Sequence, residues 1–354
     1  MSGPVPAPSS APSGVPPVLE AFFELGLERV DPSRPRVRSS PAGPGRTLSR
    51  TVRPGLGTTV EIQAVSDSGD RSAEGMQAAL EEMDRLEALL TRHREESALS
   101  VLNSTGHLAV PPPELDRILR RAVDVHRTSG GAFDISIKPL LDLFEHTDPH
   151  RLSDAEIREA RSLVGIDGLR SRDGSLRLER SGMGLTLDGI AKGWILDRMA
   201  EVLIARGLDD YLISAGGDIR TGGRPATDRP WWIGIRDPED GSWMDPIISI
   251  TGGAVATSGD YERSYTPDRS FHHIVDGSEG RSPLHAASVT VLAPDATTAD
   301  VLATTLFVKQ PDEALSFIRA LRGCSCLIIT RDGRQIRSAR WPGRPAQTGR
   351  ETLS

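Results

Sequence analysis

The chain has 354 residues, of which 37% are hydrophobic and 26% charged, so most of it is expected to be globular. This length corresponds to two domains or to one large domain. The net charge is −7, with 42 Lys and Arg against 49 Asp and Glu, which leaves no basic surplus for non-specific nucleic-acid binding. The sequence contains no run of about 18 apolar residues, so no membrane span is expected.

The two ends of the chain are predicted to lie outside the folded domain. Residues 1–50 are rich in Pro, Ser and Ala or in Pro and Arg, and are predicted to be a disordered or linker tail with a candidate short helix at 18–30. The folded domain is predicted to span 51–340, and 341–354 to form a second tail. The first residues show neither the basic and apolar segments of a secretory signal nor a cysteine for lipidation, so a cytoplasmic location is expected.

Strand and helix patterns are interspersed through the predicted domain. Helical patterns of apolar residues predict helices at 73–92, 113–129, 190–205 and 296–308, of which 113–129 and 190–205 also have proline or glycine at an end. Short apolar or alternating runs predict strands at 58–65, 185–187, 211–214, 232–235, 247–250, 254–257, 288–292 and 326–330. The strands come both singly and in runs, which predicts an α+β fold with mixed sheets and packed helices rather than a doubly wound sheet.

Two segments with glycine turns could bind a ligand. In SGGAFDISIKPLLDLF (129–144), Phe133 offers a ring for stacking and Asp134 an acceptor, and the glycines allow a ligand to approach the backbone closely. The alternative is a helix stop followed by a core phenylalanine and a capping aspartate. In LTLDGIAKGWILD (185–197), a glycine turn leads into a helix and so presents amides, the positive helix end and Lys192 to an anion. This segment resembles a phosphate cradle, although it matches neither of the standard glycine-rich motifs.

Two further segments could supply a base and metal ligands. His272 and His273 are adjacent in SFHHIVDG (270–277), and histidine is the natural general base near neutral pH. A pair of structural histidines is the alternative. Asp300 and Thr304 are four residues apart on a predicted helix and therefore share a face. Their oxygen atoms suit Mg²⁺, whereas an ordinary polar pair on a solvated face is the alternative.

Together and in this order, these segments resemble the ApbE family of FAD:protein FMN transferases. The resemblance covers about residues 51–335 and includes the further motifs GLGTTV (55–60), ESALSVLN (96–103), ISAGGDIR (213–220), GAVATSGDYERSY (253–265) and ASVTVLAPDATTADVLATTLFV (287–308). It implies a compact α+β fold with FAD in a cleft between two parts. It also implies a transferase that cleaves FAD at its pyrophosphate, passes FMN to a Thr or Ser hydroxyl of a target flavoprotein as a phosphoester, and releases AMP.

The resemblance also implies a role for each matched residue. The residues expected to contact FAD are Leu56, at the adenine end, and Ala132, Phe133, Asp134, Thr186, Lys192 and Ile274. Mg²⁺ would be held by the backbone carbonyl of Gly189 together with Asp300 and Thr304. His273 would be the base that deprotonates the acceptor hydroxyl.

Several positions depart from the family pattern. Leu56 stands where the family usually has Met, and His93 where an aromatic residue near the flavin is usual. Thr186 replaces the usual FAD-contacting Asp, and an aspartate appears two residues later. Asp188 would either substitute for the missing carboxylate from a shifted position or repel a phosphate.

Two other functions stay open at the level of sequence. An FAD pyrophosphatase would use the same metal and release FMN and AMP to water, without an acceptor protein. A flavin-binding protein would need no catalysis at all. Most family members are exported and lipid-anchored, so the absence of such a signal here implies an acceptor that is cytoplasmic or faces the cytoplasm.

Overall fold

A nine-stranded sheet organises the residues that the computed structural model describes, which are 37–226 and 229–342. Its strands, in spatial order, are β1 (Arg38–Gly43), β2 (Arg46–Gly55), β3 (Thr58–Ser66), β7 (Asp210–Ala215), β8 (Asp218–Gly222), β11 (Gly252–Gly259), β12 (Ala286–Ala293), β13 (Ser325–Thr330) and β14 (Gln335–Arg337). Two small sheets contain β9 (Trp231–Arg236) with β10 (Trp243–Ile250), and β4 (His107–Leu108) with β6 (Ser175–Leu178) and β5 (Leu169–Arg172). The α+β class is confirmed, but every ladder in the described ranges is antiparallel, where the sequence predicted mixed sheets.

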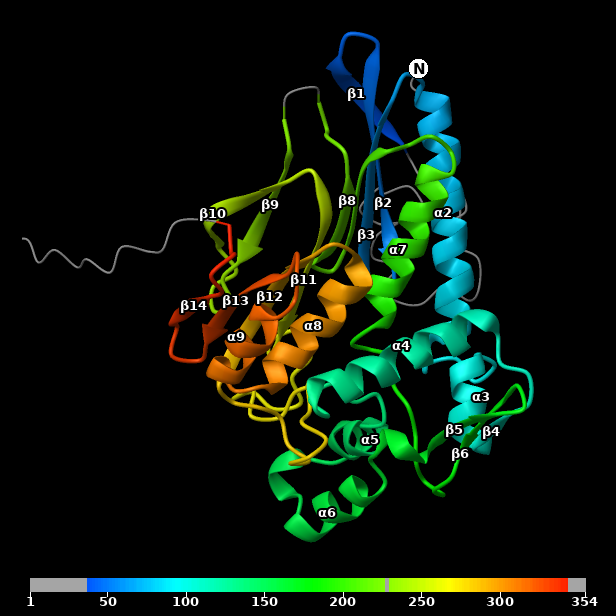
Figure 1. The fold of residues 1–354 in the computed structure, drawn as a ribbon, viewed down its shortest axis with the longest axis vertical. Coiled ribbons are helices and arrows are strands. Elements are labelled where there is room, and N and C mark those ends of the chain that lie inside the picture. Colours follow the sequence, from blue (N-terminus) through cyan, green and yellow to red (C-terminus); the bar gives the residue numbers. More distant parts are fainter. Residues whose placement is uncertain (1–36, 227–228, 343–354) are drawn as a thin grey trace, which may run out of the picture. The chain divides into compact units, whose positions relative to one another are not determined.

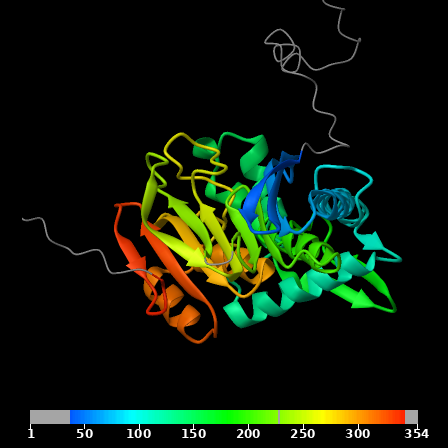
Figure 2. The ribbon, with the colours of Figure 1, turned by 90° about the horizontal axis from the view of Figure 1, so that it is seen from above.

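Helices cover one face of the large sheet and a hairpin covers the other (Figures 1 and 2). The α-helices are α2 (Gly69–Leu90), α3 (Ala98–Thr105), α4 (Pro113–Ser129), α5 (Lys138–His146), α6 (Asp154–Ser162), α7 (Ala191–Ile204), α8 (Ala296–Val308) and α9 (Pro311–Arg319). Helices α2, α7, α8 and α9 pack on the sheet, and the β9–β10 hairpin buries Ile233, Ile235 and Ile248 against its opposite face. No helix in residues 37–226 and 229–342 is both long and apolar enough to cross a membrane.

Local chemistry explains where the helices begin and end. The Ser68 hydroxyl accepts a hydrogen bond from the Arg71 amide at the start of α2, and the Asp295 carboxylate accepts one from the Thr298 amide at the start of α8. Helix α4 ends at Gly130, whose φ of 69° is the left-handed conformation that glycine adopts without a steric cost. These end signals are local, so the sequence already indicated both α4 and α8.

The structured region differs from the predicted domain at both ends. Residues 38–50, predicted to be linker, form β1 and the first half of β2, with Pro41 at an irregularity of the edge strand, where a proline is tolerated. Trp341, predicted to open a tail, is buried in the cluster under the β9–β10 hairpin. The candidate helix at 18–30 and residues 343–354 lie outside the described residues.

The short strand predicted at 185–187 does not form in the described part of the chain. The Asn103 side chain accepts a hydrogen bond from the Leu185 amide at 2.7 Å and donates one to the Leu185 carbonyl at 2.9 Å. A side chain therefore takes both backbone groups that a neighbouring strand would use. The segment joins no sheet and leads through a turn at 188–190 into α7.

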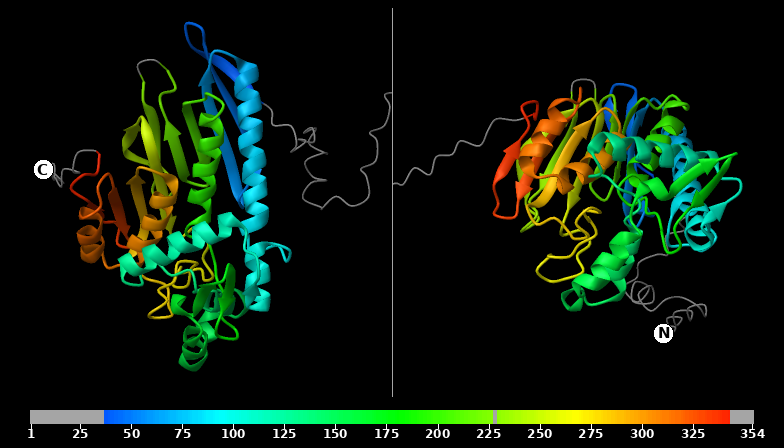
Figure 3. Two further views of the ribbon diagram at one scale, coloured as in Figure 1. Left: turned by 45° about the vertical axis from the view of Figure 1, so that its right-hand side comes forward. Right: turned by 60° about the horizontal axis from the view of Figure 1, so that its bottom comes forward.

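The loops at one end of the large sheet lie beside a second part of the fold. This part contains α3 to α6 and the three-stranded sheet (Figures 1 and 3). The β2–β3 and β7–β8 turns, the start of α7 and the segment after β11 contribute residues to two adjoining cavities here. The topology thus places segments from across the chain around one site.

Candidate active site

Two cavities share a wall at this end of the sheet. The inner cavity is lined by residues 132–135 on one side and by the start of α7, α8 and the segment at 273–275 on the other. The outer cavity, of about 550 Å³, is lined by the β2–β3 turn, the end of α2 and the start of α7. Its volume lies in the range typical of small-molecule sites. The side chains common to both cavities are Asp188, Lys192, Glu262 and His273.

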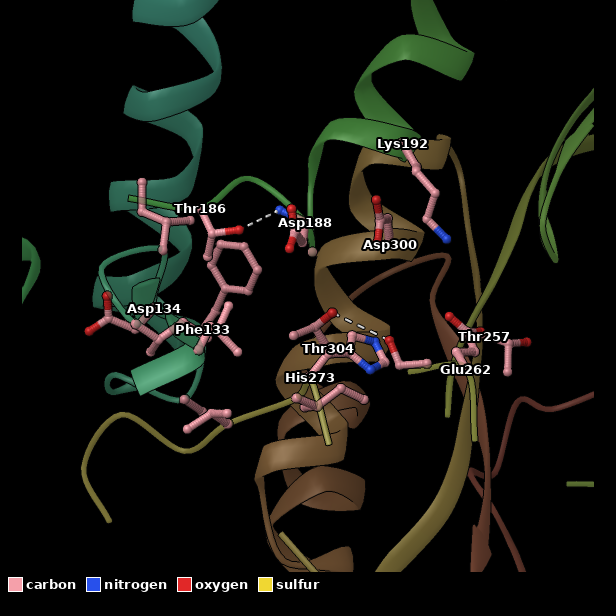
Figure 4. A pocket seen from close by; sticks show the side chains of 18 residues that line it. Phe133, Asp134, Thr186, Asp188, Lys192, Thr257, Glu262, His273, Asp300 and Thr304 are labelled. Carbon is pink, nitrogen blue, oxygen red and sulfur yellow. Dashed lines mark hydrogen bonds between the residues drawn. The ribbon is translucent and has the colours of Figure 1, made fainter. Parts of the chain in front are cut away.

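The structure brings all the sequence-predicted site residues to these cavities. Leu56 lines the outer cavity, and the inner cavity is lined by Ala132, Phe133, Asp134, Thr186, Gly189, Lys192, His273, Ile274, Asp300 and Thr304. Figure 4 shows Phe133 and Asp134 on one side and Lys192, Asp300 and Glu262 on the other, with His273 and Thr304 between them. Segments that are far apart in the sequence therefore converge on the two cavities.

Helix α7 begins against helix α8 at a glycine. The Gly193 amide donates a hydrogen bond of 2.9 Å to the Asp300 carboxylate, which orients this buried side chain. A Cβ atom on Gly193 would lie 2.3 Å from the carbonyl oxygen of Ala296. Because that neighbour is backbone, a side chain at 193 would force the two helices apart.

Replacement of Gly193 by alanine should therefore destabilise the protein. We expect a loss of about 1–3 kcal/mol in the free energy of unfolding, as for other overpacked sites, measured by urea denaturation. Gly252→Ala is the matched control, because a Cβ there meets nothing within 4 Å. Equal stability of the two variants would contradict the close packing of α7 on α8.

The three residues predicted to hold a metal line the same cavity. A Cβ on Gly189 would be 3.0 Å from Thr304 Oγ1, so the glycine turn packs directly on this hydroxyl. The Ser258 and Thr304 hydroxyls are 3.3 Å apart. Asp300 uses one carboxylate oxygen to accept from Gly193 and has the other for a further contact. A carboxylate, a hydroxyl and a backbone carbonyl are hard oxygen ligands of the kind that Mg²⁺ prefers.

The charges around Asp300 also favour a bound cation. Lys192 Nζ lies 3.1 Å from the buried Asp218 carboxylate, and Asp218, with Asp300 and Glu262, raises the Lys192 pKa above its usual value. Burial, together with Asp218, raises the pKa of Asp300 to about 8. Burial raises the pKa of Glu262 to about 7. Three carboxylates thus surround an ammonium, and a divalent cation would offset the excess negative charge and favour ionised Asp300. The residues therefore fit Mg²⁺.

His273 has the geometry of a neutral base. Its Nδ1 lies 3.3 Å from the Arg263 carbonyl oxygen, which can only accept, so Nδ1 carries the proton and Nε2 keeps its lone pair. Burial in the cavity wall lowers the His273 pKa to about 4, so the imidazole is neutral at pH 7. The neighbouring His272 is a structural histidine, since its ring is fully buried and its Nε2 bonds the Pro283 carbonyl.

The opposite wall is held in place by short local hydrogen bonds. The Phe133 amide donates to the Ser129 hydroxyl at 3.1 Å, and the Ser136 amide donates to the Asp134 carboxylate at 2.7 Å. Burial raises the pKa of Asp134 above its usual value. In the lining of the outer cavity, Leu56 adopts a left-handed conformation with φ of 53°, which is uncommon for a residue other than glycine.

The Asp188 carboxylate forms an ion pair with the Arg92 guanidinium. Its carboxylate accepts from Arg92 Nε at 3.1 Å, and the Thr186 hydroxyl accepts a hydrogen bond from the Asp188 amide at 3.2 Å. Arg92 and His93 both line the outer cavity. The Arg92 pair offsets the charge that Asp188 would otherwise present to a phosphate.

Sequence reasoning missed several charged residues of this region, among them Asp218, Glu262 and Arg92. Asp218 and Glu262 lie within the quoted motifs ISAGGDIR and GDYERSY, where an acidic residue after a glycine turn was an available signal. Arg92 carried no such signal, because its partner Asp188 is 96 residues away along the chain.

The sequence of this chain is similar to those of known proteins. The model of the ApbE family matches residues 56–328. The chain is 33% identical over 316 residues to a FAD:protein FMN transferase of Treponema pallidum, covering 80% of this chain and 85% of that protein. It is 29% identical over 291 residues to a FAD:protein FMN transferase of Vibrio cholerae, covering 79% of this chain and 86% of that protein.

Solved structures agree with the sequence matches. An ApbE protein from Thermotoga maritima superposes with a TM-score of 0.75 at 31% identity, covering 82% of this chain and 97% of that chain. The flavin transferase ApbE from Vibrio cholerae superposes with a TM-score of 0.71 at 26% identity, covering 85% of this chain and 98% of that chain. The family match spans the segments that form both cavities, and the chain belongs to the ApbE family.

Proposed function

We propose that this protein is an FAD:protein FMN transferase that depends on Mg²⁺ and modifies a Thr or Ser hydroxyl of a target flavoprotein. The observation that carries the proposal is the wall shared by the two cavities. It combines a neutral imidazole, His273, with an ammonium, Lys192, next to the oxygen ligands Asp300 and Thr304. The names of the relatives support the same reaction.

Each group has a task that its environment suits. His273 Nε2 takes the proton from the acceptor hydroxyl, and a positioned base of this kind contributes about 10²–10⁴-fold to a rate. The hydroxyl oxygen then bonds to the phosphorus of the FMN half, the pyrophosphate P–O bond breaks, and AMP leaves. Lys192 binds the phosphates electrostatically, held by Asp218 at 3.1 Å. Mg²⁺, held by Gly189, Asp300 and Thr304, would neutralise charge on the pyrophosphate.

The cavities also assign the parts of the dinucleotide. Ala132, Phe133, Asp134, Thr186 and Ile274 would line the FAD site on the inner side. Leu56, which lines the outer cavity, would contact the adenine. The walls combine apolar side chains with charged groups, and polar groups of this kind orient a bound small molecule.

The direct test combines the purified protein with FAD and Mg²⁺, with and without a flavoprotein fragment that carries an accepting Thr. Intact mass of the fragment and AMP release are measured together. A gain of one FMN per fragment, matched by AMP, is the expected result. AMP and free FMN without labelled fragment would favour a pyrophosphatase, and bound FAD without AMP would favour a flavin-binding protein.

The departures at 186 and 188 allow a separate prediction about FAD affinity. The double variant Thr186→Asp with Asp188→Gly moves a carboxylate off the shared wall and releases Arg92, so we expect FAD to bind about tenfold more tightly, which corresponds to about 1.4 kcal/mol. Fluorescence titration of FAD measures this. Thr186→Asp alone, which adds a charge, should weaken binding. Weaker binding by the double variant would show that Asp188 itself supports the bound dinucleotide.

The location of the reaction is part of the proposal. The cytoplasm is the compartment expected from the sequence, with an acceptor that lies there or faces it. Fractionation of cells, followed by detection of the protein and of FMN-labelled proteins in each fraction, measures this location.

A further inference from the structure

Four charged side chains form a continuous chain of ion pairs beside His273. Arg92 Nε lies 3.1 Å from Asp188 and Arg92 Nη2 lies 2.7 Å from Glu145. Arg263 Nη2 lies 3.1 Å from the same oxygen of Glu145. We call Asp188, Arg92, Glu145 and Arg263 the cleft ion-pair chain. It joins the start of α7, the end of α2, the end of α5 and the segment after β11.

Glu145 is the central member of the cleft ion-pair chain. Its carboxylate accepts from Arg92, from Arg263 and, at 3.3 Å, from the Tyr265 hydroxyl. The side chains of Arg92 and Glu145 are only 6% and 15% exposed. Burial would raise the pKa of Glu145, but Arg92 and Arg263 hold it below the usual value. Both groups are therefore charged, and removing one would leave the other buried without its partner.

The cleft ion-pair chain reaches His273 through the backbone of Arg263. The Arg263 carbonyl accepts from the His273 amide at 3.0 Å and from Nδ1 at 3.3 Å. Its guanidinium, in contrast, is tied to Glu145 on α5 across the cleft. The residue that sets the imidazole tautomer is thus anchored to the opposite part of the fold.

We infer that Glu145 is a positioning residue for His273, which holds Arg263 so that its carbonyl keeps the proton on Nδ1 and leaves Nε2 free as the base. This rests on the proposed function for its catalytic meaning. Glu145 is not among the described residues that line either cavity, so it acts through Arg263 and His273 instead of touching the flavin dinucleotide.

The test is Glu145→Gln, which keeps the size of the side chain and removes its charge. We expect kcat for FMN transfer to fall about 10- to 100-fold, since small misplacements of a catalytic group cost up to about 100-fold. The KM for FAD should stay within about twofold. Asp142→Asn is the matched control, because Asp142 lies one turn earlier on α5 and pairs with Lys138 on the same helix. This control should keep the wild-type kcat.

A double-mutant cycle separates positioning from a structural role. If Glu145 acts through His273, Glu145→Gln should add nothing in a His273→Ala background. Arg263→Ala removes the other end of the tether and should lower kcat by a similar factor, without a further loss when combined with Glu145→Gln. Unchanged kcat in Glu145→Gln, or equal factors lost in both backgrounds, would overturn the inference.

A spectroscopic readout keeps this test independent of the reaction. Nitrogen-15 spectra of labelled histidine, with His273 assigned by its loss in His273→Ala, should show the Nδ1–H tautomer in the wild type and a mixture in Glu145→Gln. If the wild type fails to transfer FMN, the proposed function falls, while these spectra still decide the positioning. The same His273 tautomer in the wild type and in Glu145→Gln would refute the positioning role of Glu145.

Discussion

Asp300→Asn should reduce FMN transfer by at least about 100-fold at saturating FAD, because a metal ion contributes several kcal/mol to charge stabilisation and each 1.36 kcal/mol is a factor of ten. The amide oxygen of asparagine can still accept from the Gly193 amide, so the packing of α7 on α8 is preserved. What the variant loses is the buried carboxylate aimed at the candidate metal site. Rates measured against Mg²⁺ concentration should show that this loss persists at high metal.

The control for this variant is Asp312→Asn, an exposed carboxylate in the first turn of α9. It changes the net charge by the same amount and should leave the rate unchanged. FAD binding measured without Mg²⁺ should be retained in Asp300→Asn. A wild-type dependence of the rate on Mg²⁺ in Asp300→Asn would remove Asp300 from the metal site.

His273→Ala should lower FMN transfer by about 10²–10⁴-fold, the usual contribution of a general base. Binding of FAD should change little, because the imidazole is one of many groups in the walls of both cavities. Single-turnover rates with an acceptor fragment, combined with fluorescence titration of FAD, separate the two effects. Because the His273 pKa is about 4, the wild-type imidazole is unprotonated throughout the pH range around 7.

His107→Ala provides the comparison for His273→Ala. His107 is an exposed histidine on β4 and lines neither of the two cavities among the described residues. Its removal should leave both transfer and binding as in the wild type. Transfer that survives in His273→Ala would make His273 a structural residue like His272.

The sequence predicted best those features whose causes are local. Helix α8 has the predicted bounds of 296–308, because Asp295 caps it at the start and apolar residues recur along its length. The strand at 58–65 also matches β3, whose polar and apolar residues alternate. Helices α5 and α6 were not predicted, since each has only nine residues and too few turns to show a clear period.

Features that depend on contacts between residues far apart along the chain could not be predicted from the sequence. β1 and β2 have a linker-like composition rich in Pro and Arg, and become strands through the ladder that β2 forms with β3. The segment at 185–187 is excluded from a sheet by Asn103, 82 residues earlier. The site residues could be predicted because local motifs and the family resemblance pointed to them, whereas Arg92 and Glu145 became visible only through their contacts in space.

At Leu56, the left-handed backbone lowers the stability of the fold, whereas the side chain serves the proposed binding of FAD. A residue with a Cβ atom in this conformation costs roughly 1–2 kcal/mol relative to its normal conformation, and asparagine or glycine would adopt it more readily. The leucine side chain, however, forms part of the outer cavity where the adenine is proposed to lie. Selection for thermal stability alone would therefore favour replacement of Leu56, and we expect the selected variants to bind FAD with lower affinity.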